Sequence, residues 1–185
     1  LSKPFARVPM LKLLKDATGC DLGDVSDDEI QAVCKKNNIE VGGTWNYGQM
    51  LDELMSKLVE PKLIQPTFII DYPKAISPLA KVHRNGDPNL VERYELFIGG
   101  AEFANSFSEL NDPVDQRERL EAQAALKEKG DEEAQPVDEQ FIQAMECGMP
   151  PTGGVGLGID RLTMLLTENR WIKDVILFPA MRPKK

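Results

Sequence analysis

The sequence predicts an α+β fold, in which helices flank an antiparallel β-sheet. The first observation is the Gly99-Gly100 pair, a two-residue hairpin signal with strand-forming residues on both sides. The second is a stretch of alternating glycines at 153–158, and the third is a series of segments with helical spacing of apolar residues. With 185 residues and 42% hydrophobic content, the chain can form one domain, with or without a small appendage, around a proper core.

The N-terminal third is predicted to be largely helical. A helix is expected at 9–18, where Gly19 provides a stop, and a Ser followed three residues later by a Glu forms a capping box for a helix at 26–36. A third helix is expected at 47–59, shortly before a proline. Residues 20–60 should therefore form a compact helical unit, which we interpret as an insertion in the main fold.

The remaining elements follow from strand-forming runs and amphipathic spacing. Strands are expected at 67–71, 75–80, 92–98, 101–109 and 153–157, and helices at 113–129, 137–147 and 158–167. The last of these helices should pack against the sheet through Leu162, Leu165 and Leu166. The polar residues of the helix at 113–129 should form a solvated face, made of Gln116, Arg117, Glu118, Arg119 and Glu121.

Two glutamates interrupt the apolar hairpin. A tight turn at Gly99-Gly100 pairs Phe97 with Glu102 and Glu95 with Ala104, so that these four residues project from one face. Glu95 and Glu102 are then diagonal neighbours on adjacent strands. Their carboxylates are close enough to share a divalent cation, for which carboxylate oxygens are the preferred ligands.

A row of an amide, a ring and an acid follows the second glutamate. Asn105, Phe107 and Glu109 recur with period two and share one face of a strand. Glu102 and Asn105 differ by an odd number, so a β-bulge near Ala104 is required to bring both onto one face. With that bulge, the acids and the row suit a phosphorylated cofactor beside a cationic substrate. The alternative is an exposed hairpin that carries glutamates on its solvent face.

The glycine-rich segment predicts a strand that a ligand can approach closely. Gly154, Gly156 and Gly158 alternate and leave one face of the strand without side chains. A helix begins near Gly158, and Arg161 lies in its first turn, where a phosphate partner would explain a cation. A dinucleotide-binding turn is disfavoured because Ile159 stands where its last glycine belongs. A tightly packed central strand without any ligand remains open.

The composition argues against several classes of function. No apolar run reaches the roughly 20 residues of a membrane-spanning helix, and we expect no membrane association. The single His83 leaves little material for a histidine-based zinc site or a catalytic triad. Cys20, Cys34 and Cys147 lack the CxxC spacing and are interpreted as reduced cytoplasmic thiols. The net charge of −8 argues against a nucleic-acid-binding surface on this part alone.

Taken together, these segments resemble class II aminoacyl-tRNA synthetases, and within them the bacterial-type lysyl-tRNA synthetases. The segment 154–161, Gly-Val-Gly-Leu-Gly-Ile-Asp-Arg, resembles the third motif of the class, whose arginine binds ATP. The segments 107–113 and 176–182 are similar to stretches particular to the lysine enzymes. The resemblance extends over nearly the whole chain, with the motifs in matching order and spacing.

The resemblance implies a role for each matching residue. Lysine and ATP are the implied substrates, which react to lysyl-adenylate and pyrophosphate before transfer to tRNA(Lys). Glu109 would accept the ammonium group of lysine, and Arg161 would be catalytic by stabilising charge on the phosphates. The implied lysine-binding residues are Asn105, Phe107, Glu109, Gly154 and Gly156. The implied ATP-binding residues are Glu95, Glu102, Gly158, Ile159, Asp160 and Arg161, of which Glu95 and Glu102 would hold Mg²⁺.

Parts of the family pattern have no match in this sequence. These are the first motif, which forms the homodimer interface, the second motif, which grips the α-phosphate and the tRNA end, and the N-terminal anticodon-binding barrel. Residues 1–185, which begin without a Met, are therefore predicted to be the C-terminal part of a cytoplasmic synthetase's catalytic domain, inactive alone. One alternative is a paralogue that lysylates a translation elongation factor, although such paralogues tend to carry Ala where Gly156 stands. Another is a non-catalytic binding fragment.

Overall fold

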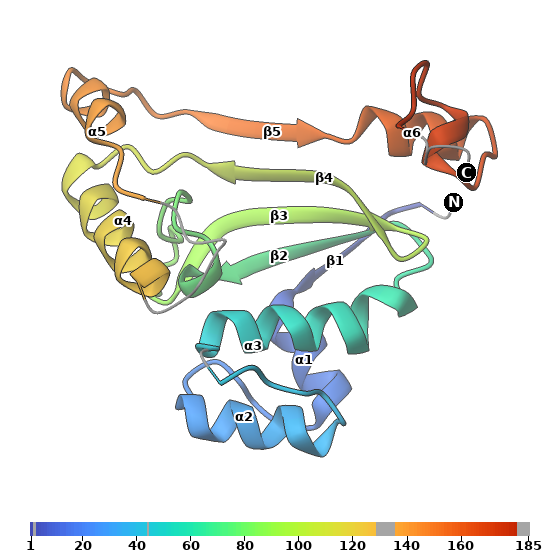
Figure 1. Cartoon of the computed structure of the whole chain (residues 1–185), viewed down its shortest axis with the longest axis horizontal. Helices are drawn as coiled ribbons and strands as arrows, with labels where there is room; N and C mark the ends of the chain where they lie inside the picture. The colour runs from blue at the N-terminus through green and yellow to red at the C-terminus, as the bar shows by residue number, and fades with distance from the viewer. Residues whose placement is uncertain (2, 44, 129–135, 181–185) are drawn as a thin grey trace, which may run out of the picture.

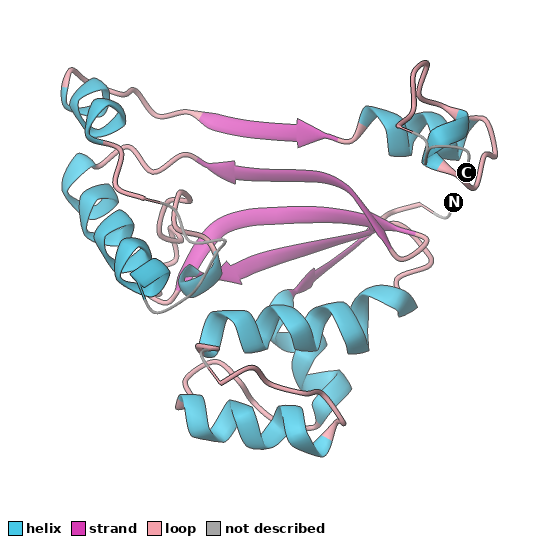
Figure 2. Cartoon of the chain, in the orientation of Figure 1, coloured by secondary structure: helices cyan, strands magenta, loops and turns pink. Residues whose placement is uncertain are grey.

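The computed structural model describes residues 1, 3–43, 45–128 and 136–180 and confirms the α+β fold class (Figures 1 and 2). One sheet contains five strands in the order β1-β2-β3-β4-β5. Their bounds are β1 Ala6–Pro9, β2 Thr67–Pro73, β3 Leu90–Ile98, β4 Ala101–Ser108 and β5 Gly153–Leu157. β1 runs parallel to β2, and the other neighbouring strands are antiparallel. The sequence prediction lacks β1, because four residues ending in proline show too little alternation.

The N-terminal helices form where the sequence predicts them. They are α1 Met10–Thr18, α2 Asp27–Lys36 and α3 Tyr47–Leu54, which continues into η1 Met55–Val59 and η2 Glu60–Lys62. Gly19 ends α1 at a φ of +76°, and the capping box of α2 is present, with Glu29 accepting from the Ser26 amide at 2.8 Å. The helices share one core with the sheet, in which Leu14, Leu51 and Ile69 are fully buried. That residues 20–60 form an insertion stays a prediction.

The β3–β4 hairpin has the predicted tight turn. Gly99 and Gly100 adopt φ values of +61° and +76°, a combination that favours glycine at both turn positions. Phe97 pairs with Glu102, as expected. The tip of the hairpin is held against the end of η2, because the amides of Gly99 and Gly100 donate to the backbone oxygens of Ile64 and Leu63 at 3.0 Å each.

A β-bulge in β4 changes the register beyond the turn. Leu96 pairs with Ala104 and Glu95 with Asn105, so Phe103 is the extra residue on β4. The predicted bulge is therefore confirmed, whereas the predicted pairing of Glu95 with Ala104 is wrong by one residue. As a result, Ala104 lies on the other face of the sheet from Glu95, where it is buried.

The predicted strand at 75–80 is wrong. A short 3₁₀ helix, η3 Lys74–Ile76, is followed by a loop, and only Ala80 forms an isolated bridge, with Glu109. Side chains take the carbonyl oxygens that a strand would use for its ladder. Arg93 donates to Ile76 O at 2.9 Å, Gln116 to Pro78 O at 3.2 Å and Arg119 to Ala80 O at 2.7 Å. Residues 74–80, which we call the wall loop, are thus clamped from two sides.

The helices α4 Pro113–Glu128 and α5 Glu139–Glu146 stand together at one end of the sheet (Figure 1). The predicted end of α4 at Lys129 lies outside the described residues. The prediction of a wholly solvated face is wrong for Gln116 and Arg119, which are buried because they bind the wall loop. Arg119 also pairs with Asp115 at 2.7 Å. Within the described ranges, no helix is long and apolar enough to cross a membrane.

The β5 edge of the sheet, opposite to the β1 edge, is open. β5 is the edge strand, and α6 Ile159–Leu166 follows it, with the short η4 Ile172–Asp174 further on (Figure 1). No residue of α6 is buried. Leu162 and Leu165 are partly buried, but Leu166 is 74% exposed, so its predicted packing on the sheet is wrong. β5 is the last strand of the sheet, so no further strand of the described chain lies beside it.

Candidate functional site

The register of three strands brings most of the predicted site residues onto one face. Glu95 lies opposite Asn105, which lies opposite Gly156, and Phe107 lies opposite Gly154. Glu102 joins this face through its pairing with Phe97, two residues from Glu95. The bulge makes this possible, since without it Glu102 and Asn105 would point to opposite faces. The sequence thus predicted the grouping correctly, through a bulge that it required.

Glu95 is the centre of a hydrogen-bond network. Its Oε1 accepts from Arg93 Nη2 at 2.5 Å and from Asn105 Nδ2 at 3.3 Å, and its Oε2 accepts from the Tyr72 hydroxyl at 2.7 Å. The Arg93 guanidinium also lies 4.6 Å from the centre of the Tyr72 ring. Burial, followed by the charge of Glu95, raises the pKa of Tyr72 strongly, so the phenol remains a donor.

Glu102 and Glu60 add negative charge beside Glu95. Burial raises the pKa of Glu102, and the charge of Glu95 is the next cause. Glu60, at the start of η2, also has a raised pKa, through burial first and then the charges of Asp52, Glu95 and Glu102. No group of three or more His, Cys, Asp or Glu side chains in the described ranges is arranged to hold a metal by itself. A cation here would therefore need ligands from another molecule, such as phosphate oxygens.

The predicted ATP end of the site begins at the bulge. Gly158, the N-cap of α6, donates its amide to Phe103 O at 2.8 Å, and Arg161 Nη1 donates to Glu102 O at 2.5 Å. The Arg161 guanidinium also lies 3.8 Å from Glu102 Oε2. Ile159 and Asp160 occupy the first turn between them and are exposed. The start of α6 thus binds the backbone of the bulge, and Arg161 and Glu102 lie side by side.

Glu109 lies over the glycine strand. A β-carbon added at Gly154 would come within 2.2 Å of Glu109 Oε1, whereas one at Gly156 would meet nothing closer than Asn105 O at 3.8 Å. Burial raises the pKa of Glu109. Its side chain is half-buried and forms no hydrogen bond or ion pair with the rest of the described chain. An unpaired, partly desolvated carboxylate of this kind is stabilised by a cationic ligand.

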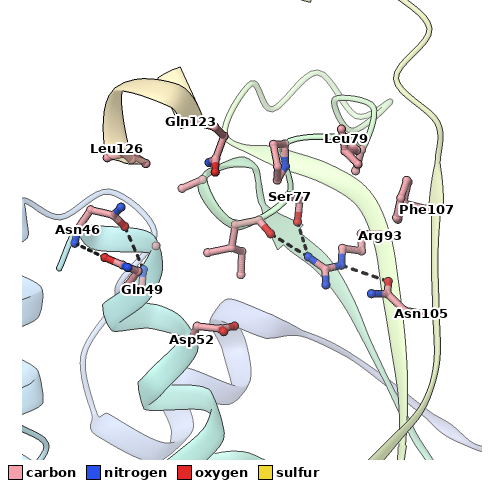
Figure 3. A pocket seen from close by; sticks show the side chains of 15 residues that line it. Asn46, Gln49, Asp52, Ser77, Leu79, Arg93, Asn105, Phe107, Gln123 and Leu126 are labelled. Carbon is pink, nitrogen blue, oxygen red and sulfur yellow. Dashed lines mark hydrogen bonds between the residues drawn. The ribbon is translucent and has the colours of Figure 1, made fainter. Parts of the chain in front are cut away.

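A cavity of about 400 Å³ adjoins this row (Figure 3). Arg93, Asn105 and Phe107 line it from the sheet, and residues 75–80 of the wall loop line it next to Arg93. Further lining comes from Asn46, Gln49 and Asp52 of the α3 segment and from Gln123 and Leu126 of α4. Glu109 and the glycine strand do not line it, so the predicted lysine residues border the cavity only at Asn105 and Phe107.

The sequence prediction missed Arg93, Tyr72, Ser77 and Glu60. Arg93 could have been found, because it lies two residues before Glu95 and therefore on the same face of an apolar strand. Tyr72 and Ser77 carried no comparable signal, since only the folded chain brings them to Glu95 and Arg93. Glu60 is separated from the hairpin by more than thirty residues of sequence and reaches it only through the contact of η2 with the turn.

Comparison with known proteins places the chain in a family. The family model described as tRNA synthetases class II (D, K and N) matches residues 1–182. The chain therefore belongs to this family of class II tRNA synthetases, as the motif resemblance predicted. The match extends over the sheet, the wall loop and the whole candidate site.

Three similar proteins, all lysine–tRNA ligases, illustrate the likeness. The chain is 50% identical over 182 residues to the lysine–tRNA ligase of Porphyromonas gingivalis, covering 98% of this chain and 31% of the relative. It is 51% identical over 185 residues to that of Halalkalibacterium halodurans, covering all of this chain and 37% of the relative. A third, from Azobacteroides pseudotrichonymphae, is 48% identical over 182 residues. The chain thus spans about a third of the length of the curated relatives it matches.

Proposed function

We propose that this chain is the C-terminal part of the catalytic domain of a lysine–tRNA ligase. The observation that carries the proposal is the unpaired carboxylate of Glu109 over Gly154, at the end of the Asn105–Phe107 row on a synthetase sheet. A lysine side chain has the matching chemistry, with an apolar stem and a cationic tip. The names of the similar proteins support the same substrate.

In this proposal the lysine lies along the row. The Glu109 carboxylate accepts the ammonium group, and the Phe107 ring packs against the aliphatic stem. Asn105 binds a polar group nearer the reacting end. The backbones of Gly154 and Gly156 allow the amino acid to approach the strand, and Gly154 also leaves the space that the Glu109 carboxylate occupies. Binding lysine removes the penalty of burying Glu109 without a partner.

ATP would bind at the bulge, with Glu95 and Glu102 holding a magnesium ion that supplies positive charge to the phosphate oxygens. The residues fit this role in part. Three donors occupy Glu95, two on Oε1 and one on Oε2, so Oε2 retains a lone pair. Gly158, Ile159, Asp160 and Arg161 would contact the nucleotide from the start of α6. In this proposal Arg161 would stabilise negative charge on the phosphates.

The proposed reaction uses these residues as follows. A carboxylate oxygen of lysine attacks the α-phosphorus of ATP, the bond from that phosphorus to the bridging oxygen breaks, and pyrophosphate leaves. The products are lysyl-adenylate and pyrophosphate. Asn105 and Glu109 orient the attacking amino acid, and Arg161 stabilises the charge that develops on the leaving group. A terminal hydroxyl of tRNA(Lys) then attacks the carbonyl carbon of lysyl-adenylate, the lysyl ester forms, and AMP leaves.

The rest of the protein would complete the site. The open edge of β5 and the exposed Val155 and Leu157 side chains are the surface that a preceding part of the same catalytic domain would cover. That part would supply the second grip on the α-phosphate, the tRNA contacts and the homodimer interface. A cytoplasmic location agrees with these substrates.

The full-length protein tests the proposal directly. It should catalyse ATP–pyrophosphate exchange that depends on lysine and Mg²⁺, and it should charge tRNA(Lys). Ornithine and arginine, which carry a cationic tip at a different distance, are matched control substrates and should support much less exchange. Absence of lysine-dependent exchange would overturn the proposal. Activation of lysine followed by transfer to an elongation factor, and not to tRNA, would favour the paralogue.

A further inference from the structure

The Arg93 side chain joins two residues of the proposed lysine and ATP sites to the wall loop. Its guanidinium is nearly buried, with 17% of the side chain exposed. Nη1 donates to Ile76 O at 2.9 Å and to Ser77 Oγ at 2.8 Å, Nη2 donates to Glu95 at 2.5 Å, and Nε donates to Asn105 Oδ1 at 3.3 Å. Figure 3 shows the Arg93 guanidinium between the wall loop and the Asn105 amide.

We propose that Arg93 is a positioning residue for the activation of lysine, which acts by fixing the Asn105 amide and the Glu95 carboxylate in one orientation each. The inference rests on the proposed function, because it concerns the same site. Arg93 itself need not touch the lysine or the ATP. It holds two groups that would touch them, and it takes its own fixed position from the wall loop.

The Asn105 amide has only one compatible orientation. Its oxygen faces Arg93 Nε and its nitrogen faces Glu95 Oε1. A flipped amide would place its NH₂ against the Arg93 donor and its oxygen against the Glu95 acceptor, and both contacts would be repulsive. One N–H of Asn105 therefore remains free for a ligand. Asn105 thus presents a defined donor, which suits an oxygen atom of the amino acid and not its ammonium group.

The Glu95 carboxylate is oriented by the same arrangement. Arg93 and Asn105 occupy Oε1, and Tyr72 occupies one position on Oε2. The remaining lone pair on Oε2 is therefore the one available to a cation. Glu102, which shares the face, has no such clamp within the described chain beyond the 3.8 Å approach of Arg161. Arg93 thus fixes one of the two acids of the proposed magnesium site.

Arginine is needed at this position because of its geometry. A planar fork can donate in several fixed directions at once, whereas a lysine ammonium is a single point on a flexible stem. Lysine in place of Arg93 would keep the charge next to Glu95. It could not also hold Ile76 O, Ser77 Oγ and Asn105 Oδ1 in the observed directions. Arg93→Lys therefore keeps the positive charge beside Glu95 and removes the hydrogen bonds that fix the neighbouring groups.

The first experiment measures lysine and ATP kinetics of full-length Arg93→Lys in pyrophosphate exchange. Removing a group that orients a ligand-binding residue typically costs about 10- to 100-fold in affinity or activity. We expect the KM for lysine and the Mg²⁺ concentration for half-maximal activity to rise by that factor. Arg84→Lys is the matched control. Arg84 pairs with Glu92, whose side chain lies on the face of β3 opposite to that of Arg93. This control should leave both values within about two-fold.

The second experiment tests whether Arg93 acts through Asn105. Asn105→Ala removes the oriented amide, so adding Arg93→Lys to it should raise the KM for lysine by much less than Arg93→Lys does alone. Fully additive effects on this KM would overturn the proposal, as would a normal lysine KM in Arg93→Lys. These outcomes concern only the role of Arg93. The proposed function is tested by the wild-type protein, and it fails only if the wild type shows no lysine-dependent exchange.

Ser77→Ala provides a milder variant if Arg93→Lys does not fold, as judged by circular dichroism and thermal melting. It removes one acceptor of Arg93 and leaves the guanidinium in place. The loss of one hydrogen bond should raise the KM for lysine by about 2- to 10-fold. An unchanged KM for lysine in a folded Ser77→Ala protein would contradict the proposed role of the wall loop and of Arg93.

Discussion

The two edges of the sheet differ in how completely they are covered. On the β1–β2 side, helices α1–α3 close over the strands, and Leu14, Leu51 and Ile69 are fully buried. On the β5 side, α6 has no buried residue, Val155 is 70% exposed and Leu166 is 74% exposed. Both edges carry the same kind of apolar residue. The difference is that the described chain supplies a covering layer on only one side.

The difference separates the proposed site into two parts. Glu95 and Asn105 lie on central strands, and side chains from β2, β3 and the wall loop fix them. Gly158 and Arg161 lie at the open edge, where their contacts in the described chain go to the β4 backbone and to Glu102. Glu95 and Asn105 of the proposed metal and amino-acid sites are thus preorganised within the described chain, whereas the proposed nucleotide end lies at an edge that the described chain leaves uncovered.

The largest expected effect follows from the open edge. The isolated 185-residue chain should show no measurable lysine-dependent ATP–pyrophosphate exchange, because it lacks part of the proposed phosphate grip. Loss of even one charge-stabilising donor costs about 100- to 1000-fold in rate. The measurement compares the isolated chain with the full-length protein at equal concentration. Robust exchange by the isolated chain, free of full-length enzyme, would show that the open edge is not the missing half of the site.

The second prediction compares a covered leucine with an exposed one in the isolated chain. Leu51→Ala removes a side chain with 0% exposure and should lower the free energy of unfolding by about 2–5 kcal/mol. Leu166→Ala, at the open edge, should change it by less than about 0.5 kcal/mol. Urea denaturation measures both values. Similar losses at both positions would mean that α6 is packed as firmly as the N-terminal core.

The third prediction concerns Glu109, whose carboxylate lies over Gly154 of the edge strand β5. In the full-length protein, Glu109→Gln keeps the shape and removes the charge, so lysine binding should weaken by about 2–5 kcal/mol with ATP binding little changed. Glu118→Gln, an exposed change of the same kind on α4, is the control and should have no effect on either ligand. Isothermal titration with each ligand measures the difference. An equal loss for lysine and ATP would remove Glu109 from the amino-acid site.

The smallest expected effect is on the stability of the covered region, through the ion pair of Glu92 with Arg84. Hydrogen bonds from Arg84, joined by one from Ser108, lower the pKa of Glu92 from 4.5 to about 2 against the opposing effect of burial. A lowered pKa in the folded state contributes stability above pH 4.5, and this contribution is lost as the pH falls through about 2. Arg84 is exposed, so screening limits the contribution to about 1 kcal/mol. Glu92→Gln should therefore lower the free energy of unfolding at pH 7 and leave it nearly unchanged near pH 2.

Thermal or urea unfolding across this pH range checks the last prediction. High salt should reduce the difference between wild type and Glu92→Gln at pH 7, because the Arg84 partner is solvent-exposed. A difference that persists unchanged at pH 2 would mean that Glu92 stabilises the strand by packing and not through its charge.

The sequence by itself determined the family, the helices and four of the five strands. The capping box at Ser26 and the stop at Gly19 were confirmed because their hydrogen bonds form within a few residues. The turn at Gly99-Gly100 was confirmed because both glycines adopt the positive φ values that such a turn requires. The bulge near Ala104 was required by the interpretation that Glu102 and Asn105 share one face, and the register of the β3–β4 pair contains it.

Only the tertiary structure decided where distant groups meet. The strand expected at 75–80 became the wall loop because Arg93, Gln116 and Arg119, from β3 and α4, bind its carbonyl oxygens. The same contacts bury two α4 side chains that were expected in solvent. The sequence could place Arg93 beside Glu95, but its bonds to Ile76, Ser77 and Asn105 form only in the folded chain. Hydrogen bonds between residues far apart in the chain leave no periodic trace, so no pattern in the sequence could predict them.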